Sequence, residues 1–114
     1  MKIVENISVS ELGQMAEKLF GNIVKADVDV EKKIVIVDME MHVDGEQVLL
    51  EAGSSQNDIW GINLKPSDYG TDNFIEFDSM INIRPRQENP SREVLDESVR
   101  ALIREIVNGV VHEQ

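Results

Sequence analysis

Apolar and polar positions alternate along residues 24–30, which is the period of a strand with one buried face. A second β-rich run covers residues 34–41, and a two-residue turn at Glu31-Lys32 joins the two runs as an antiparallel hairpin. In this register Lys25 lies opposite Asp38. An opposite-charge pair of this kind favours one register over a shift by a single residue. The pattern therefore predicts a hairpin whose alternate positions face a core.

Three other segments place apolar residues three and four positions apart, which is the spacing of a helix with one buried face. Each begins after a residue whose side chain can cap a helix N-terminus, namely Ser8, Asp44 and Asp96. Glu11 follows Ser8 at the spacing of a capping box. The sequence thus predicts helices over residues 9–20, 45–52 and 97–109.

Two further strands are predicted over residues 59–64 and 74–83. Pro85 ends the second one, because proline has no backbone N–H to donate to a neighbouring strand. The order is α, β, β, α, β, β, α, and residues 2–5 can add a short edge strand. Strands and helices do not alternate singly, so the sequence predicts one α+β domain over residues 1–114. We expect an antiparallel sheet of two hairpins with the three helices mainly on one face.

The chain has 114 residues, no cysteine, and 22 acidic against 11 basic side chains, for a formal charge of −11. The lack of cysteine excludes disulfides, thiolate catalysis and cysteine-ligated metals. The negative charge opposes binding to nucleic acid or anionic lipid. The longest uninterrupted apolar run is Ile34–Val37. We therefore expect no export signal and no membrane span, and a cytoplasmic protein.

Acidic and amide side chains gather on one predicted face of the sheet. If the more apolar side of each strand faces the helices, the opposite side collects Asp38, Glu40, Glu76, Asp78, Asn63 and Asn82. Oxygen-rich clusters bind divalent cations, and a bound cation can activate water for phosphoester hydrolysis. An ordinary half-solvated sheet has the same polar face without any metal, and this alternative is the more common one. The candidate metal ligands are Asp38, Glu40, His42, Glu76 and Asp78.

A second candidate site is the segment 83–92, which carries Arg84, Arg86 and Arg92 in an otherwise acidic chain. Guanidinium groups close to the start of a helix can clamp a carboxylate or a phosphate. The alternative is that these arginines pair with nearby acids. Further ligand-binding candidates are Asn63, Asn82 and Trp60. A single tryptophan on a strand is also typical of a core.

Motifs for several reaction classes are missing from the sequence. There is no G-x-S-x-G segment for a serine nucleophile, and neither G-x-G-x-x-G nor a Walker sequence for phosphate binding. Aromatic residues make up 4% of the chain, which does not favour RNA binding through stacked bases.

Two segments, Asp58–Pro66 with the sequence DIWGINLKP and Ile75–Pro85 with the sequence IEFDSMINIRP, resemble the signature segments of a small prokaryotic domain family of unknown function. The similarity extends over most of the chain. The resemblance implies relatives but no reaction, cofactor or partner, because none is assigned to the family. Family members carry tyrosine at the position of Lys65 and an additional arginine at the position of Pro90.

Two functional hypotheses follow. The first is a small cytoplasmic binding or protein-interaction module that uses the polar sheet face and the Arg-containing loop, with no cofactor and with a protein or a small ligand as partner. The alternative is a divalent-metal-dependent hydrolase of the phosphoester class that uses the sheet carboxylates. Assembly into a homo-oligomer through a sheet edge or the end of the last helix is open under either hypothesis.

Overall fold

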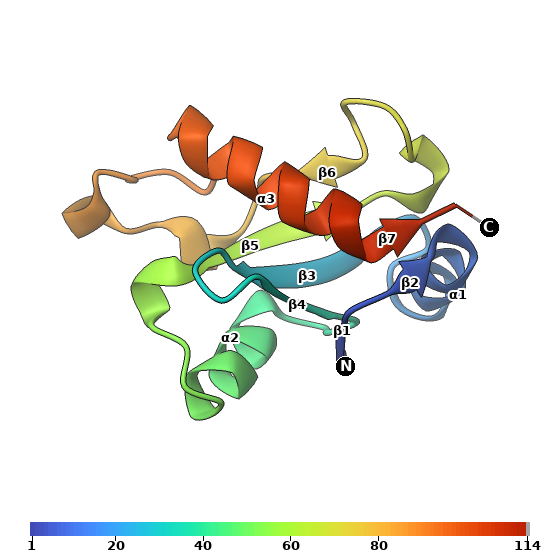
Figure 1. Ribbon diagram of the computed structural model, residues 1–114, viewed down its shortest axis with the longest axis horizontal. Coiled ribbons are helices and arrows are strands. Elements are labelled where there is room, and N and C mark those ends of the chain that lie inside the picture. Colours follow the sequence, from blue (N-terminus) through green and yellow to red (C-terminus); the bar gives the residue numbers. More distant parts are fainter. Residues whose placement is uncertain (114) are drawn as a thin grey trace.

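A five-stranded antiparallel sheet forms the middle layer of the protein, seen here in a computed structural model that describes residues 1–113 (Figure 1). The strands follow the order β1-β4-β3-β5-β6 across the sheet. Their bounds are Lys2–Val4 for β1, Val24–Asp29 for β3, Ile34–Val37 for β4, Ile59–Leu64 for β5 and Ile75–Glu76 for β6. A separate parallel pair joins β2, Ile7–Ser8, to β7, Val111–His112. Both predicted hairpins and the predicted edge strand are present.

Three α-helices cover the two faces of the sheet, and α2 and α3 lie on opposite sides of it in Figure 1. Their bounds are Val9–Leu19 for α1, His42–Glu51 for α2 and Glu97–Val110 for α3. α1 and α3 share one apolar cluster with the sheet, to which Leu12, Val28 and Ile103 belong. α2 packs over a smaller cluster, which comprises Ile36, Met39, Leu49 and Ile59. The fold is α+β as predicted. No helix within residues 1–113 is long and apolar enough to cross a membrane.

The first hairpin has the predicted register, with Val28 opposite Val35. Its turn is longer than predicted, because the strand pairing stops at Asp29 and resumes only after residues 30–33. The Oδ1 of Asp29 accepts hydrogen bonds from two backbone N–H groups of this turn, both at 2.9 Å. An aspartate side chain therefore shapes the turn in the absence of an Asn-Gly dipeptide.

The predicted ion pair between Lys25 and Asp38 does not form. The backbone N–H of Asp38 donates to the carbonyl oxygen of Lys25 at 3.1 Å, but Asp38 has a φ of 71° and leaves the extended conformation. Its carboxylate lies 3.8 Å from the N-terminal ammonium group of Met1. The ammonium of Lys25 lies 4.9 Å from the centroid of the Phe20 ring. Among residues 1–113, no carboxylate lies within ion-pair distance of Lys25.

Two of the three predicted helix caps are confirmed. Ser8 Oγ accepts a hydrogen bond at 3.0 Å, and Asp96 Oδ1 accepts one at 2.8 Å, each from a backbone N–H of the first helical turn. The prediction for α2 is wrong, because this helix begins earlier, after Met41, and Asp44 lies inside its first turn. Gly45 of the same turn approaches the sheet so closely that an added Cβ would meet neighbouring side chains. Tertiary packing, and not a capping side chain, sets the start of α2.

The sheet face beneath α2 differs from the solvated polar surface that the alternation indicates. Asp27 and Asp29 are fully buried there. Asp29 accepts a hydrogen bond of 2.6 Å from Ser54 Oγ. Asp27 packs closely against Gly45 of α2, because a Cβ added to this glycine would lie 2.4 Å from Asp27 Oδ2. The expectation of a half-solvated sheet is therefore wrong for this part of the molecule, because α2 covers it.

The strand predicted over residues 74–83 ends at Glu76. Beyond it the side-chain amide of Asn82 takes the place of a neighbouring strand, accepting from the N–H of Gly61 at 2.8 Å and donating to its carbonyl oxygen at 2.9 Å. An amide side chain satisfies the same backbone groups as a strand does, so the apolar alternation does not distinguish the two. Short 3₁₀ helices occupy Gln56–Asp58, Pro66–Asp68, Met80–Asn82 and Pro85–Gln87.

Candidate functional site

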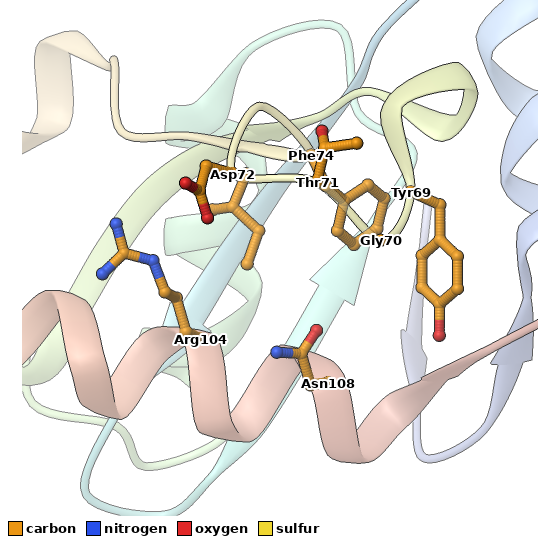
Figure 2. Close-up of a pocket in the computed structure, with 8 residues that line it drawn as sticks. Tyr69, Gly70, Thr71, Asp72, Phe74, Arg104 and Asn108 are labelled. Carbon is orange, nitrogen blue, oxygen red and sulfur yellow. The ribbon is translucent and has the colours of Figure 1, made fainter.

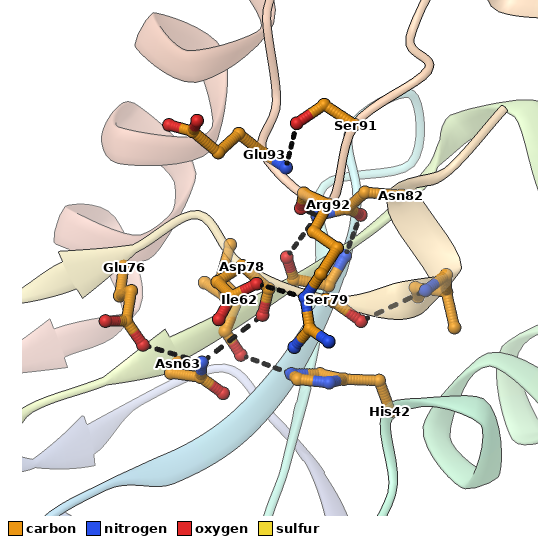
Figure 3. Close-up of polar contacts among 12 residues, drawn as sticks. His42, Ile62, Asn63, Glu76, Asp78, Ser79, Asn82, Ser91, Arg92 and Glu93 are labelled. Carbon is orange, nitrogen blue, oxygen red and sulfur yellow. Dashed lines mark hydrogen bonds and ion pairs between the residues drawn. The ribbon is translucent and has the colours of Figure 1, made fainter. Parts of the chain in front are cut away.

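Three polar residues form a row across the sheet. Asn63 of β5 lies directly opposite Lys25 of β3 on one side and Glu76 of β6 on the other. Residues opposite each other in antiparallel strands share a face, so their side chains lie beside one another. The row ends in a pocket of about 160 Å³ between the start of α2 and the segment that follows β6 (Figure 3). The lining residues are Lys25, Met41, His42, Val43, Asn63, Asp78, Ser79, Met80, Ile81 and Arg92.

Asn63 lines this pocket, and its side chain is almost completely buried. Its side chain is 5% exposed, and its Nδ2 donates to Glu76 Oε1 at 2.9 Å and to the carbonyl oxygen of Asp78 at 3.3 Å. These two acceptors fix the orientation of the amide, because the opposite orientation would place three oxygens together. The Oδ1 of Asn63 then has no hydrogen-bond partner within the described part of the chain.

His42 lies beside Asn63 and is also buried, with 8% of its surface exposed. Its Nε2 is 2.8 Å from the carbonyl oxygen of Ile62, so this nitrogen carries a proton and donates it. Burial lowers the pKa of His42 and the positive charge of Lys25 adds to this, while the contacts with Ile62 and Asn63 and the charge of Asp78 only partly oppose it. The imidazole is therefore neutral near pH 7, and its Nδ1 is a hydrogen-bond acceptor.

The mouth of the pocket combines an ion pair with apolar side chains. Arg92 Nε donates to Asp78 Oδ1 at 2.6 Å, and the backbone N–H of Ser79 donates to the carbonyl oxygen of Arg92 at 3.0 Å. Two methionines beside this pair, Met41 and Met80, are largely exposed. Methionine side chains adapt to apolar groups of varied shape. The mouth therefore offers flexible apolar contact next to a charged pair.

The start of α2 adds free backbone donors. Its N-cap, Met41, makes no side-chain capping hydrogen bond, and the first residues of the helix line the pocket. Asp44 of the first turn faces a different hollow, together with Asp38 and Gln47. The N-terminal amides of a helix attract negative charge. The start of α2 therefore contributes partial positive charge to this side of the pocket.

The predicted candidates Arg84 and Trp60 make their contacts within the protein. Arg84 donates to the carbonyl oxygens of Ile81, at 3.0 Å, and Ile59, and it lies 3.7 Å from Glu46 Oε2. Its guanidinium stacks on Trp60, with 4.7 Å between the guanidinium carbon and the ring centroid. Trp60 is part of the larger apolar cluster.

The remaining candidates of this group differ in exposure. Asn82 is fully buried and bonded to Gly61, whereas Arg86 is exposed and does not line the pocket. Only Asn63 and Arg92 of the predicted ligand-binding residues therefore meet at this pocket.

The predicted metal ligands are dispersed. Glu76 pairs with Lys65 at 3.3 Å and Asp78 pairs with Arg92, whereas Asp38 lies beside the N-terminus. Glu40 lines the hollow near Asp38 and not the pocket that contains His42. Within residues 1–113, no three His, Asp or Glu side chains are arranged to hold a metal ion. The geometry gives no support to the metal-dependent hydrolase.

A buried charge cluster beneath α2 is absent from the sequence predictions. Asp27 has no hydrogen-bond partner on either carboxyl oxygen, and the Oε2 of Glu46 has none either. Burial, reinforced by the charge of Glu46, raises the pKa of Asp27 to about 9, while the backbone amide of Glu46 and the charge of Arg84 only partly oppose this. Asp27 is therefore protonated near pH 7. The sequence signal that could have revealed it is Gly45, a glycine inside a predicted helix, which allows close approach to the sheet.

A second hollow, of about 300 Å³, lies between the loop after β5 and α3 (Figure 2). Tyr69 and Phe74 form one wall, with their rings in edge contact at 5.1 Å between centroids. Arg104 and Asn108 of α3 line the other side. None of the unpartnered buried polar atoms found in residues 1–113 lies in this hollow. The pocket at Asn63 is therefore the better candidate.

The sequence profile of a family described as a protein of unknown function, DUF5674, matches residues 1–110. The chain belongs to this family. No curated protein and no solved structure gives a significant match. Membership in DUF5674 confirms the family resemblance seen in the sequence, and no activity is attached to DUF5674. The two segments that carry the resemblance, Asp58–Pro66 and Ile75–Pro85, contact each other through the hydrogen bonds of Asn63 and Asn82.

Proposed function

We propose that this DUF5674 protein is a small-ligand-binding module whose site is the pocket between the start of α2 and Arg92. One observation carries the proposal, namely the meeting of polar side chains from separate segments, His42, Asn63 and the Arg92–Asp78 ion pair, around one pocket. A few convergent polar groups in a concave site can fix the orientation of a small ligand.

The surroundings of Asn63 support binding from two directions. Lys25 and Asn63 come from the sheet, and Arg92 comes from the Arg-containing loop. Loop and sheet are held together by a buried amide, because Asn82 Nδ2 donates to the carbonyl oxygen of Gly61 in β5 at 2.9 Å and to that of Arg92 in the loop at 3.0 Å. A frame fixed in this way can present its polar groups without reorganising, which favours affinity.

The test is a titration of ¹⁵N-labelled protein with pools of small polar metabolites, monitored by heteronuclear NMR. We expect chemical-shift changes centred on the His42 backbone, the Asn63 side-chain amide and Met80. Pools that change only resonances of the hollow in Figure 2, or no resonances at all, would refute this proposal.

A pair of matched variants distinguishes binding in this pocket from binding elsewhere on the protein surface. Met80 is exposed at the pocket mouth and Leu95 is exposed outside the pocket, so a larger side chain at either position does not disturb the core. Met80→Trp fills the mouth and should abolish the shifts, whereas Leu95→Trp should leave them intact. Equal behaviour of the two variants would contradict the assignment of the pocket.

A further inference from the structure

Exposed apolar side chains from two separate segments meet at the mouth of the pocket. Met41, Val43 and Met80 are 58%, 45% and 64% exposed, and all three line the pocket beside the half-buried Ile81. The first two belong to the start of α2, and Met80 begins the 3₁₀ helix Met80–Asn82. Exposed apolar patches with a polar rim are typical of interaction sites. We call Met41, Val43 and Met80 the methionine patch.

The apolar surface continues from the methionine patch towards the end of α1. Lys25 lines the same pocket, and its ammonium lies 4.9 Å from the centroid of the Phe20 ring, which is 41% exposed. Lysine stems cover apolar surface while the charged end stays in contact with water. The stem of Lys25 therefore connects the methionine patch with Phe20. A ligand small enough for a pocket of about 160 Å³ would leave most of this surface uncovered, whereas a segment of another protein is long enough to cover it.

The unpaired charges next to the methionine patch are negative. Glu40 precedes Met41 in the chain, Asp44 follows Val43, and both acidic side chains are exposed. With Asp38 they line a hollow of about 410 Å³, and no lysine or arginine is among its lining residues in the described part of the chain. Neither Glu40 nor Asp44 forms an ion pair with another group of residues 1–113.

The two cations at the pocket mouth do not neutralise this acidic hollow. Arg92 donates to Asp78 at 2.6 Å, and the ammonium of Lys25 lies over Phe20. The chain as a whole carries a formal charge of −11. Complementary charge accelerates association and excludes partners of like charge. The charges therefore favour a basic partner over a second copy of this acidic chain.

We infer that the methionine patch, together with Glu40 and Asp44, binds a segment of another protein that carries large apolar side chains beside lysine or arginine. The apolar side chains of the segment pack on the methionines, which adapt to groups of varied shape. Its basic side chains pair with the two carboxylates. The inference goes beyond the proposed function, because the segment covers the rim and needs no metabolite inside the pocket.

Selection from a random peptide library displayed on phage tests the chemistry of the partner without assuming it. The wild-type protein is the target, and counter-selection on an unrelated acidic protein removes peptides that bind negative charge alone. We expect the enriched peptides to combine large apolar residues with lysine or arginine. Absence of enrichment, or enrichment of peptides without basic residues, would refute the inference.

The apolar contact is tested by fluorescence anisotropy with the most enriched peptide. Met41→Ser/Met80→Ser removes both methionines, and the fold tolerates it, because serine favours the N-cap position of Met41 and Met80 is exposed. We expect this double variant to bind about tenfold more weakly. Ile3→Ser/Leu95→Ser changes two exposed apolar residues outside the patch and should keep the wild-type affinity. Equal affinities of the two double variants would exclude the patch as the binding surface.

The charged contact has its own matched variants. Glu40→Gln/Asp44→Asn should weaken binding of the peptide about tenfold and reduce its dependence on salt concentration. Glu97→Gln/Glu105→Gln removes the same charge from exposed positions of α3 and should leave the affinity within about twofold. A similar loss in both double variants would mean that only the net charge of the protein attracts the peptide, which contradicts the inference.

The remaining outcomes identify other occupants of the patch. Dimers of the wild type that are absent from Met41→Ser/Met80→Ser in sedimentation velocity would show that a second copy covers the patch, and would overturn the inference. Metabolite-induced shifts at His42 and Asn63 without any peptide binding would leave the proposed function intact and refute this inference. Peptide binding without metabolite-induced shifts would support this inference and refute the proposed function.

Discussion

The side-chain amide of Asn82 forms two hydrogen bonds with the backbone of Gly61, one to its N–H and one to its carbonyl oxygen. Asn82 also donates to the carbonyl oxygen of Arg92 at 3.0 Å. One side chain thus joins β5, the segment after β6 and the loop that carries Arg92. The position of Arg92 at the candidate pocket depends on this amide.

Replacing Asn82 with alanine should therefore lower the free energy of unfolding by about 2–4 kcal/mol, because the buried N–H and carbonyl oxygen of Gly61 lose their partners. Urea denaturation followed by circular dichroism measures the change. Asn73→Ala, at an exposed loop position, is the control and should have little effect. A loss below about 1 kcal/mol in Asn82→Ala would show that water or another group replaces the amide.

Gly61 itself is required for the close approach of the two segments. A Cβ added there would lie 2.6 Å from both Cβ and Oγ of Ser79. Gly61→Ala should therefore destabilise the fold by about 1–3 kcal/mol through overpacking. Combining it with Ser79→Gly removes both clashing atoms, so the double variant should be more stable than the sum of the single effects predicts. Strict additivity of the two single effects in urea denaturation would contradict a direct clash.

Asp27 makes stability depend on pH. Its pKa is about 9 in the fold against an ordinary value of 3.8 in the unfolded chain, so between these values the folded state holds more protons. The contribution of this group to stability is complete below the lower value and decreases as the pH rises towards the higher one, by up to about 1.4 kcal/mol per pH unit.

Asp27→Asn cannot ionise, so this decline should be absent from the variant. The free energy of unfolding of the variant minus that of the wild type should increase steadily from about pH 5 to about pH 8. Urea denaturation at intervals across this range measures it, with the exposed Asp72→Asn as the control. Parallel curves for Asp27→Asn and the wild type would mean that the buried carboxyl group ionises at an ordinary pH.

Arg84 and Arg86 should behave differently although they are two positions apart. Arg84→Ala removes the cation beside the buried Glu46 and leaves that carboxylate unpaired, which should destabilise the fold by about 3–5 kcal/mol. Arg86 is exposed, so Arg86→Ala should change stability by less than about 0.5 kcal/mol. Thermal denaturation of the two variants compares them directly. Similar melting temperatures would argue against the structural role of Arg84.

The features that the sequence predicts correctly depend on neighbouring residues. The caps at Ser8 and Asp96 and the pairing of Val28 with Val35 follow from short-range spacing and alternation. The errors arise where a distant segment decides the outcome. The predicted strand stops at Glu76, and Asn82 bonds to Gly61 in place of a strand neighbour. This contact joins residues too far apart for a local pattern to reveal.

For the candidate site too, the sequence indicates individual residues, but only the fold shows which of them lie together. Asn63, His42, Asp78 and Arg92 are polar residues within or at the end of predicted strands or in the basic loop, so the sequence indicates them individually. Their meeting at one pocket requires the pairing of β3 with β5 and the early start of α2. The sequence pairs Lys25 with Asp38 of the neighbouring strand, whereas in the structure its ammonium lies over the ring of Phe20.

The parallel pairing of β2 with β7 has a consequence for the order in which the protein folds. Ile7 lies opposite Val111, so β2 meets its strand neighbour only after the α-helices and strands between them have been made. Closing so long a loop has a high entropic cost. The β3-β4 hairpin can form as soon as it emerges, whereas the β2-β7 contact completes the native topology late and joins the start of α1 to the end of α3.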